Sequence, residues 1–529
     1  MNRDTEITPE SNQELKALVL ELQAKLDQQT QLINQLLEQI RLARHQHFGV
    51  RSERYSLDQL ALVFNEAEVA AGQTPEDCST DDTDAGSTAD SIVVPAHLRK
   101  RGGRKPLPAE LPRVEVVYTL DELSCDCAGC SGELSVIGEK ISEQLDITPA
   151  RVQVVRHVKK TYACGRCQGR PTTAPMPVQP IPKSMASAGT LAHIATAKYV
   201  DGLPLYRQER QLKRIGVDLP RSTLANWMVK AGMLVQPLIN LLRDRLLNHD
   251  IIAMDETRLQ VLKEPGRRPQ SQSYLWVQRG GPPDHPIVLY DYDPSRSQQV
   301  PIRLLDDFAG YLQTDAYEGY SAVISNNGIT PLGCWAHVRR KFDEALKAQA
   351  GMTPGKRKAS LAAYALRKIQ ALYRIERETK LLTDNGRQVV RVNRSLPLLD
   401  EFRVWLDQHI PIVPPRSALG KAMNYAHKQW PKLTTYTEDG RLRMDNNLTE
   451  NAIRPFVIGR KNFLFCDSVA GAKSSANLYS LIETAKANGI EPYAYLKTIF
   501  TELPQANSLD EIEALLPVPA DEESVAKVS

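Results

Sequence analysis

Three acidic side chains give this sequence the means for metal-dependent chemistry. Asp255 follows the apolar run IIAM, Asp315 follows GYLQT, and Glu450 lies in the polar, helix-forming segment DNNLTENAI. Carboxylates suit Mg²⁺, which takes only a few protein oxygens and keeps several waters. Two such ions about 3.5–4 Å apart activate an attacking water and stabilise the leaving oxygen when a phosphodiester is cut. We therefore predict that Asp255, Asp315 and Glu450 are catalytic and bind Mg²⁺ or Mn²⁺, with Asp255 bridging two ions.

Glu450 also has a purely structural interpretation. Asn447 could cap a short helix, and Glu450, three residues further on, could reach back to it as a capping box. The chain contains 63 acidic residues, so the spacing of three acids decides nothing by itself. The elements that carry these acids must decide between the two interpretations.

The segments around the first two acids predict a mixed α/β core. IIAMDETRLQVL, SQSYLWVQRG and HPIVLYDYD indicate three consecutive strands, PSRSQQVPIRLLDDF a helix, and GYLQTDAYEGY a fourth strand that ends at Asp315. This order predicts a ribonuclease-H-like catalytic core over residues 250–465, whose first and fourth strands are neighbours and bring Asp255 and Asp315 to one edge of the sheet. We expect a helical insertion at about residues 343–435 and a C-terminal helical region over residues 466–515.

Basic residues flank the second and third acids. CWAHVRRKF follows a predicted fifth strand, and the Glu450 helix continues into IRPFVIGRKNFLF. Phosphate contacts position DNA without reading its sequence, and we predict such contacts for His337, Arg339, Arg340, Arg454, Arg460 and Lys461. A structural role at a helix start is the alternative for the first three. Pro455 is expected to end or kink the helix at Arg454.

Two CxxC pairs predict a zinc-ribbon-like domain over residues 112–175. Each pair places two thiolates at the tip of a turn, and four thiolates complete a tetrahedral zinc site. The expected ligands are Cys127, Cys130, Cys164 and Cys167. Cys125 is an extra sulfur that could replace Cys127. The alternative is a set of reduced cysteines without metal near a β-hairpin.

Residues 186–245 predict a helix-turn-helix. In LPLYRQERQLKRIGVDLPRSTLANWMVKAG one helix ends near Gly216, and a second begins after Ser222 or Thr223, either of which can cap it. The second helix of this motif can enter the major groove of DNA. Its predicted DNA-contacting residues are Arg221, Asn226 and Lys230. A helical hairpin that serves only the core is the alternative.

The N-terminal part of the chain predicts a coiled coil over residues 12–46. Apolar residues repeat in heptads, with β-branched residues dominating one core position and Leu the other, and Gln29 interrupts them once. This pattern favours a parallel dimer in which one polar residue fixes the register. A single amphipathic helix packed on its own domain is the alternative.

A linker separates this coil from the cysteine pairs. Over residues 71–108 an acidic stretch rich in Ser and Thr, which buries too little apolar surface to order itself, gives way to the basic arm HLRKRGGRKPLP. Arg101, Arg104 and Lys105 of this arm are predicted to bind DNA, because arginines enter narrow minor grooves. A solvated basic linker is equally compatible with these residues.

The overall composition does not by itself identify the kind of protein. With 66 basic and 63 acidic residues the net charge is only +3, so charge alone does not indicate a nucleic-acid partner. The sequence starts without a secretory signal and has no apolar run of roughly 20 residues. We therefore expect a cytoplasmic protein with no membrane partner.

Taken together, these motifs resemble the transposases of the insertion sequence 66 family. The resemblance rests on FGVRSERY, RGGRKPLP, the CxxC pairs, MDET, TDAYEGY, CWAHVRRKF and DNNLTENAIRPFVIGRKNFLF, in this order. It implies that Asp255, Asp315 and Glu450 are the DDE triad of a DNA transposase that binds the terminal inverted repeats of its element and catalyses DNA cleavage and strand transfer. It also implies zinc-finger and leucine-zipper-like segments and two small accessory proteins as partners. The first knuckle, CDCAGC, departs from the family by its extra Cys125 and the lack of a Pro after the first ligand.

The sequence thus predicts a multidomain α/β protein with a coiled coil, a zinc ribbon, a helix-turn-helix and a catalytic core. Its expected partners are double-stranded DNA and a second copy of the chain. A different kind of protein has the same N-terminal modules, namely a dimeric, zinc-containing DNA-binding regulator with an inactive ribonuclease-H-like domain. The presence of all three acids favours the enzyme.

Overall fold

The computed structural model describes scattered positions between residues 20 and 40, residues 152–162, 172–326, 328–349, 355 and 359–517 of the 529-residue chain. By contacts the chain divides into one unit of Met1–Pro75 with Pro175–Ser529 and another of Glu76–Ala174. The predicted zinc ligands Cys127, Cys130, Cys164 and Cys167 and the arm residues Arg101, Arg104 and Lys105 lie outside the described residues.

Little of the second unit belongs to the described residues. There β1 (Thr161–Tyr162) pairs antiparallel with β2 (Thr172–Thr173).

Between residues 20 and 40, the described positions are helical, and Leu26, Ile33 and Ile40 of the predicted coiled-coil core are more than half exposed. These exposed apolar side chains are compatible with a second helix packing on them, and the coiled coil stays a prediction.

A six-stranded mixed sheet forms the centre of the larger unit. Its strands are β3 (Ile251–Lys263), β4 (Gln272–Gly280), β5 (Ile287–Asp293), β6 (Tyr311–Gln313), β7 (Thr330–Leu332) and β8 (Cys466–Ser468). The order is β5-β4-β3-β6-β7, with β8 also paired to β3. Strands β3, β4 and β5 form an antiparallel meander, whereas β6, β7 and β8 run parallel to β3. The predicted order of three strands, a helix, α8 (Gln299–Leu304), and then a fourth and a fifth strand is confirmed.

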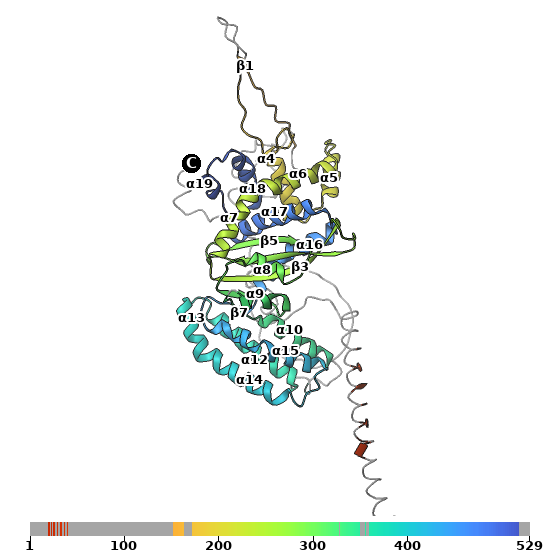
Figure 1. Cartoon of the computed structure of the whole chain (residues 1–529), viewed down its shortest axis with the longest axis vertical. Coiled ribbons are helices and arrows are strands. Elements are labelled where there is room, and N and C mark those ends of the chain that lie inside the picture. The colour runs from red at the N-terminus through yellow and green to blue at the C-terminus, as the bar shows by residue number, and fades with distance from the viewer. Residues whose placement is uncertain are drawn as a thin grey trace, which may run out of the picture. The chain divides into compact units, whose positions relative to one another are not determined.

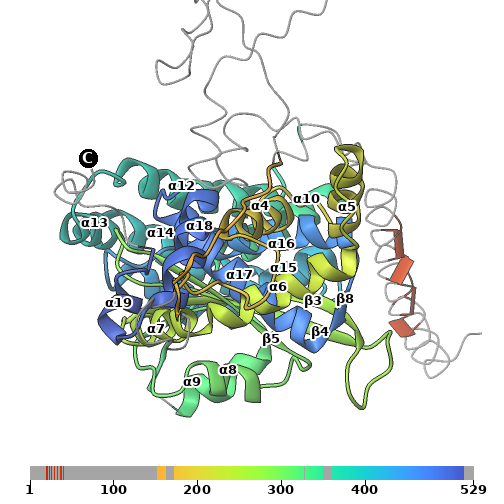
Figure 2. The same cartoon turned by 90° about the horizontal axis from the view of Figure 1, so that it is seen from above.

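Helices from both ends of this unit cover the sheet. They are α4 (Ala188–Tyr199), α5 (Leu205–Arg214), α6 (Arg221–Leu234), α7 (Gln236–Leu247), α16 (Asn447–Phe463), α17 (Val469–Ala487), α18 (Pro492–Glu502), η5 (Leu503–Gln505) and α19 (Leu509–Glu513). Figure 2 shows α4, α6, α16 and α17 overlying the strands. Their buried side chains form one core with those of the sheet, which includes Trp276, Tyr290 and Tyr479.

Helix α17 supplies hydrogen-bond partners to the edge of the sheet at β5. Strand β5 is an edge strand, and the backbone N–H groups of such strands need partners. Ser480 Oγ accepts the N–H of Tyr290 at 2.8 Å, and Thr484 Oγ1 accepts that of Val288 at 3.0 Å. On its other side α17 crosses α6 closely at Gly232, where an added Cβ would lie 2.4 Å from Cβ of Ser474. The helix therefore connects the edge of the sheet to α6, the second helix of the predicted helix-turn-helix.

A second group of helices lies between β7 and α16 in the sequence. It comprises α10 (Trp335–Ala348), α12 (Leu361–Glu378), α13 (Asp384–Val390), the π-helical turn η3 (Arg391–Ser395), α14 (Leu396–His409), α15 (Ala418–Thr434) and η4 (Thr435–Thr437). These helices have their own core, built around Trp335, Phe342 and Phe402. Figure 1 shows the sheet between this group and the group of α4, α6, α17 and α18. The short elements η2 (Glu318–Tyr320) and α9 (Ser321–Asn326) join β6 to β7.

Three local predictions are wrong. Pro455 does not end α16 at Arg454, because the helix continues to Phe463 with Ile453 and Phe456 buried in the core, and this burial outweighs the hydrogen bond lost at proline. The second helix of the helix-turn-helix begins at Arg221, without a Ser or Thr cap, because Glu209 Oε1 accepts the Arg221 N–H at 3.0 Å. The fourth strand ends at Gln313 and not at Asp315.

Among the described residues, no helix combines the length and the apolar character that crossing a bilayer requires.

Candidate active site

Asp255 and Asp315 come from neighbouring parallel segments in matching positions. Ala253 of β3 is paired with Gln313, the last residue of β6. Each aspartate lies two residues beyond this pair, so both follow the same end of the β3–β6 ladder. At Asp315 the chain has already left β6. The Oδ1 atom of Asp315 accepts the backbone N–H of Tyr317 at 2.9 Å. This turn fits Asp, whose side chain commonly bonds the backbone two residues on.

Asp255 is the most perturbed acid of the group. Burial, together with the charges of Glu256, Asp315 and Glu450, raises its pKa to about 8, while the Glu256 N–H opposes this by donating to Asp255 Oδ1 at 2.8 Å. Both other predicted triad members therefore lie near enough to repel its charge. A buried carboxylate that is repelled by two half-buried ones fits a divalent cation, because the cation removes the repulsion that burial makes costly.

Asn446 fixes the beginning of the helix that carries Glu450. Its side chain is only 2% exposed, and its Nδ2 donates to the carbonyl of Met254 on β3 at 3.1 Å. Its backbone N–H donates to Cys334 Sγ at 3.3 Å. Gln313 Nε2 on β6 donates to the carbonyl of Arg443 at 2.9 Å. The segment before α16 is thus fastened to β3, to β6 and to the residue that precedes α10.

The capping-box interpretation of Glu450 is wrong. Asn446, not Asn447, is the N-cap of α16, and it makes no capping bond with its side chain. The Asp445 carboxylate instead accepts the Asn447 N–H at 3.3 Å and its Nδ2 at 3.0 Å. The Glu450 carboxylate points towards α10, where the side chains of His337 and Arg340 face it.

His337 and Arg340 face Glu450 from the first turns of α10. His337 Nε2 lies 3.8 Å from Glu450 Oε1, and Arg340 Nη2 lies 3.4 Å from Oε2. Burial lowers the pKa of His337, although the charge of Glu450 opposes this effect. Arg340 is exposed and Arg339 is half-buried. Of the three residues predicted here, the structure brings His337 and Arg340 to the third acid of the triad.

Sequence reasoning missed a network that holds the loop of Asp315. The Glu256 side chain is 2% exposed, accepts Tyr320 Oη at 2.6 Å and accepts Arg296 Nε at 2.7 Å. The Arg296 guanidinium lies 3.9 Å from the centre of the Tyr317 ring, and Tyr317 donates its backbone N–H to Asp315. Glu256 lies in the motif MDET, and Tyr317 and Tyr320 lie in TDAYEGY, but no local pattern separates Glu256 from the catalytic acids.

Helix α15 of the predicted helical insertion also contributes a side chain to this region. Lys432, in the last turn of α15, is half-buried, and burial lowers its pKa while the charge of Asp315 opposes this shift. No spacing rule connects Lys432 with Asp315 in the sequence, so only the fold could reveal it. The insertion therefore supplies a cation near the second acid.

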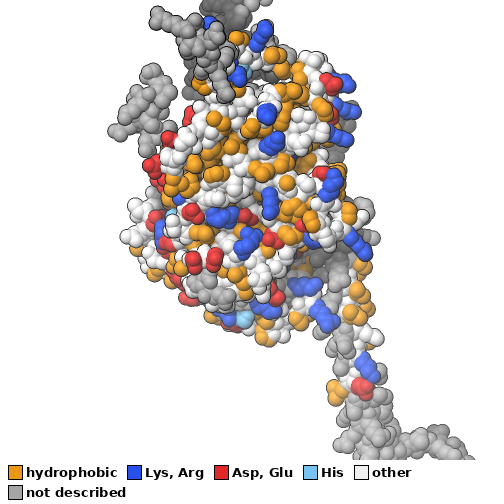
Figure 3. Space-filling view, turned by 45° about the horizontal axis from the view of Figure 1, so that its top comes forward, with side chains coloured by type: hydrophobic (Ala, Val, Ile, Leu, Met, Phe, Trp, Pro, Cys, Tyr) orange, Lys and Arg blue, Asp and Glu red, His pale blue; other side chains and the backbone are white. Residues whose placement is uncertain are grey.

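The other predicted DNA-binding residues that the structure describes lie on two helices. Arg221, Asn226 and Lys230 are exposed on α6, opposite the buried Leu224, Trp227, Met228 and Ala231. On α16, Lys461 is exposed and Arg454 half-buried, whereas Arg460 donates to Thr257 Oγ1 at 3.2 Å and to the carbonyl of Arg258 on β3. Figure 3 shows Lys and Arg side chains interspersed with acidic ones on the face in view, without a single basic patch.

Comparison with known proteins decides the family. Residues 183–474, which carry Asp255, Asp315 and Glu450, match the family model described as Transposase IS66 family. The chain belongs to this family. Residues 480–518 match the IS66 C-terminal element, residues 124–168 the zinc-finger binding domain of transposase IS66, and residues 35–116 the model described as Transposase C of IS166 homeodomain. The predicted zinc ligands all fall within the zinc-finger match.

Relatives of this IS66 transposase family member occur in Sinorhizobium fredii. The uncharacterized protein y4jD is 33% identical over 425 residues, which cover 78% of this chain and 81% of that protein. The uncharacterized protein y4qI is 32% identical over 493 residues, which cover 90% of this chain and 87% of that protein. The similarity therefore extends over most of the chain and is not restricted to one module.

The raised pKa of Asp255 predicts how the stability of the metal-free protein changes with pH. Folded Asp255 holds its proton up to about pH 8, whereas its ordinary pKa is 3.8. The folded state thus binds more protons between these values, and its free energy of unfolding falls as the pH rises through this window. Urea unfolding at about pH 5 and about pH 8 should show a smaller fall for Asp255→Asn than for the wild type. Equal falls in the two proteins would contradict the raised pKa.

Proposed function

We propose that this member of the IS66 transposase family is a DDE-type enzyme that binds the terminal inverted repeats of its element and catalyses metal-dependent DNA cleavage and strand transfer. The observation that carries the proposal is the convergence of Asp255, Asp315 and Glu450 from β3, from the loop after β6 and from α16, with electrostatic coupling of Asp255 to the other two. The mixed sheet, with its antiparallel meander and the strands β6, β7 and β8 parallel to β3, supports a ribonuclease-H-like core for this domain.

The three carboxylates have distinct parts in this proposal. Asp255 interacts electrostatically with both of the other acids, so it is the one suited to contact two ions, and Asp315 and Glu450 would each hold one. Two Mg²⁺ or Mn²⁺ ions there would stabilise the attacking and leaving oxygens. Water attacks first and frees a 3′-hydroxyl at the element end, and this hydroxyl then attacks target DNA. Arg339, Arg340 and Lys432 are suited to the phosphates of the strand being cut.

Nicking of a labelled element end tests the activity. The wild-type protein should nick the duplex at the element boundary when Mg²⁺ or Mn²⁺ is present and leave it intact without either ion. A protein that binds the same end and never cuts it would support the alternative, a zinc-containing DNA-binding regulator with an inactive core. We place this reaction in the cytoplasm. We expect the protein to act as at least a dimer, with the small accessory proteins of the element as partners.

The zinc-finger match leads to a prediction about metal content. We propose that Cys127, Cys130, Cys164 and Cys167 bind one zinc ion per chain through thiolates. Cys164→Ser should lose this zinc in metal analysis of purified protein, whereas Cys466→Ser should keep it, because Cys466 is a buried free cysteine of the β8 strand. Comparing the zinc content of Cys125→Ser with that of Cys127→Ser identifies which of the two cysteines is the first ligand. Absence of zinc from freshly prepared, reduced wild-type protein would refute the site.

Lys461 leads to a prediction about DNA affinity. If this exposed side chain of α16 contacts a phosphate, Lys461→Gln should weaken binding alike for all sequences and reduce the slope of log affinity against log salt concentration by roughly 0.9. Lys497→Gln, which makes the same charge change on the exposed surface of α18, is the matched control. Arg460 is a poorer choice because its guanidinium is bonded to β3. A slope that Lys461→Gln leaves unchanged would exclude the contact.

A further inference from the structure

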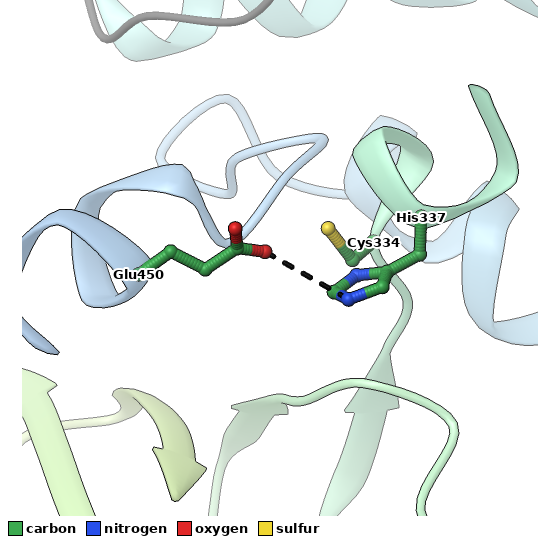
Figure 4. A group of neighbouring side chains, drawn as sticks. All are labelled: Cys334, His337 and Glu450. Atoms are coloured by element: carbon green, nitrogen blue, oxygen red, sulfur yellow. Dashed lines mark ion pairs between the residues drawn. The ribbon is translucent and has the colours of Figure 1, made fainter. Parts of the chain in front are cut away.

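Three potential metal-binding side chains meet where α10 and α16 begin. Ligand atoms of Cys334, His337 and Glu450 all lie within 4.8 Å of one another. Figure 4 shows the carboxylate of Glu450 and the imidazole of His337 facing each other, with the thiol of Cys334 beside them and a dashed line from Glu450 to His337 Nε2. Glu450 belongs to the proposed triad, whereas the other two residues come from the CWAH segment, for which the triad provides no role.

His337 and Glu450 face each other but do not form a hydrogen bond. The distance of 3.8 Å between Nε2 and Oε1 exceeds the length of a hydrogen bond. Glu450 Oε1 and His337 Nδ1 are both buried without a hydrogen-bond partner. Both atoms stay unpaired whichever ring nitrogen carries the proton, and unpaired buried polar atoms are costly. A cation bound by Nε2 and Oε1 would give these two atoms a partner.

The spacing suits a shared ion. Octahedral ligands about 2.1 Å from a metal are about 3.0 Å apart when adjacent and about 4.2 Å apart when opposite. The observed 3.8 Å lies between these two values, so a small side-chain rotation would bring both atoms to the ion. Arg340, at 3.4 Å from Oε2, sits on the other oxygen of the carboxylate and leaves Oε1 available.

We propose that His337 is a nitrogen ligand of the divalent ion held by Glu450, which makes the centre favour Mn²⁺ over Mg²⁺. This inference rests on the proposed function for the role of Glu450. Imidazole suits transition metals, whereas Mg²⁺ takes oxygen ligands. Cys334 is a positioning residue in this arrangement, because its buried sulfur accepts the Asn446 N–H at 3.3 Å and so holds the start of α16 against α10.

Pulsed electron paramagnetic resonance of bound Mn²⁺ tests the ligand directly. Wild-type protein loaded with Mn²⁺ should show modulation from a coordinated nitrogen. His337→Gln should still bind Mn²⁺ through its carboxylates but lack this modulation, and its preference for Mn²⁺ over Mg²⁺ in competition binding should fall about tenfold. His427→Gln, which removes an imidazole that lies 3.3 Å from Asp407 and away from the triad, is the matched control and should keep the nitrogen signal.

The same experiment separates this inference from the proposed function. Asp255→Asn should abolish the bound Mn²⁺ signal if the carboxylates form the centre. Wild-type protein that binds Mn²⁺ in an Asp255-dependent manner without nitrogen modulation would overturn the role of His337 and leave the triad intact. Failure of the wild type to bind Mn²⁺ in an Asp255-dependent manner would overturn both. A His337→Gln protein that keeps the nitrogen modulation would also refute His337 as the ligand.

Discussion

Asp255→Asn is expected to lose more than about a hundredfold of the metal-dependent cleavage of element ends while it retains their binding. Loss of residues that merely orient metal ligands costs roughly 10–100-fold, and Asp255 is proposed to touch the ions themselves. The amide has nearly the same shape as the carboxylate but lacks the charge that holds a cation. The variant should also fold well, because the wild-type carboxyl is buried and has a pKa of about 8, so a neutral group already occupies this position near neutral pH.

The assay compares nicking and end binding for each triad variant under the same conditions. Asp315→Asn and Glu450→Gln should behave like Asp255→Asn. Asp250→Asn is the matched control, since Asp250 immediately precedes β3 and its carboxylate pairs with Arg441 at 2.8 Å, on the exposed surface. A Glu450→Gln protein with full nicking activity would remove Glu450 from the centre, and with it the proposed role of α16.

The sequence sufficed for the two aspartates because their surroundings are encoded locally. Alternating apolar residues mark β3, and a short apolar run marks β6, so the order of strands and the convergence of Asp255 and Asp315 follow from pattern and topology. Glu450 was harder, since nothing local distinguishes a helical glutamate that binds metal from one that caps. Its assignment depended on the two aspartates and on the family resemblance, and the structure adds that its carboxylate faces α10.

Features that depend on long-range contacts could not be predicted. The sequence DNN offers two adjacent asparagines, and only the carbonyl of Met254, far away in the chain, makes Asn446 the anchoring one. Pro455 predicts a helix end by its local chemistry, yet the burial of Ile453 and Phe456 keeps α16 intact. Glu256 likewise resembles a catalytic acid until Arg296 and Tyr320 are seen to hold it. In each case a distant partner overrides or completes the local signal.

Arg391 links the insertion to the segment that leads into α16. Its side chain is 1% exposed and forms an ion pair with Glu376, with Nε and Nη2 donating at 2.9 and 2.6 Å. Its remaining hydrogen bonds go to the carbonyls of Tyr436, Asp439 and Leu442. These carbonyls belong to the chain that returns from α15 to Asn446, so one buried guanidinium fixes the path that delivers Glu450 to the site.

Arg391→Ala should therefore destabilise the protein by about 3–5 kcal/mol, because removing one partner of a buried ion pair leaves the other uncompensated. Arg394→Ala is the matched control, since Arg394 also lies on η3 but pairs with Glu378 at the surface, with both side chains about half exposed, and should cost only about 0–1 kcal/mol. Urea unfolding measures both changes. Because the three carbonyls lose their donor, Arg391→Ala should also reduce nicking under conditions where the protein is still folded, whereas Arg394→Ala should not. Equal stability of the two variants would show that Arg391 does not fasten the insertion to the segment that carries the third acid.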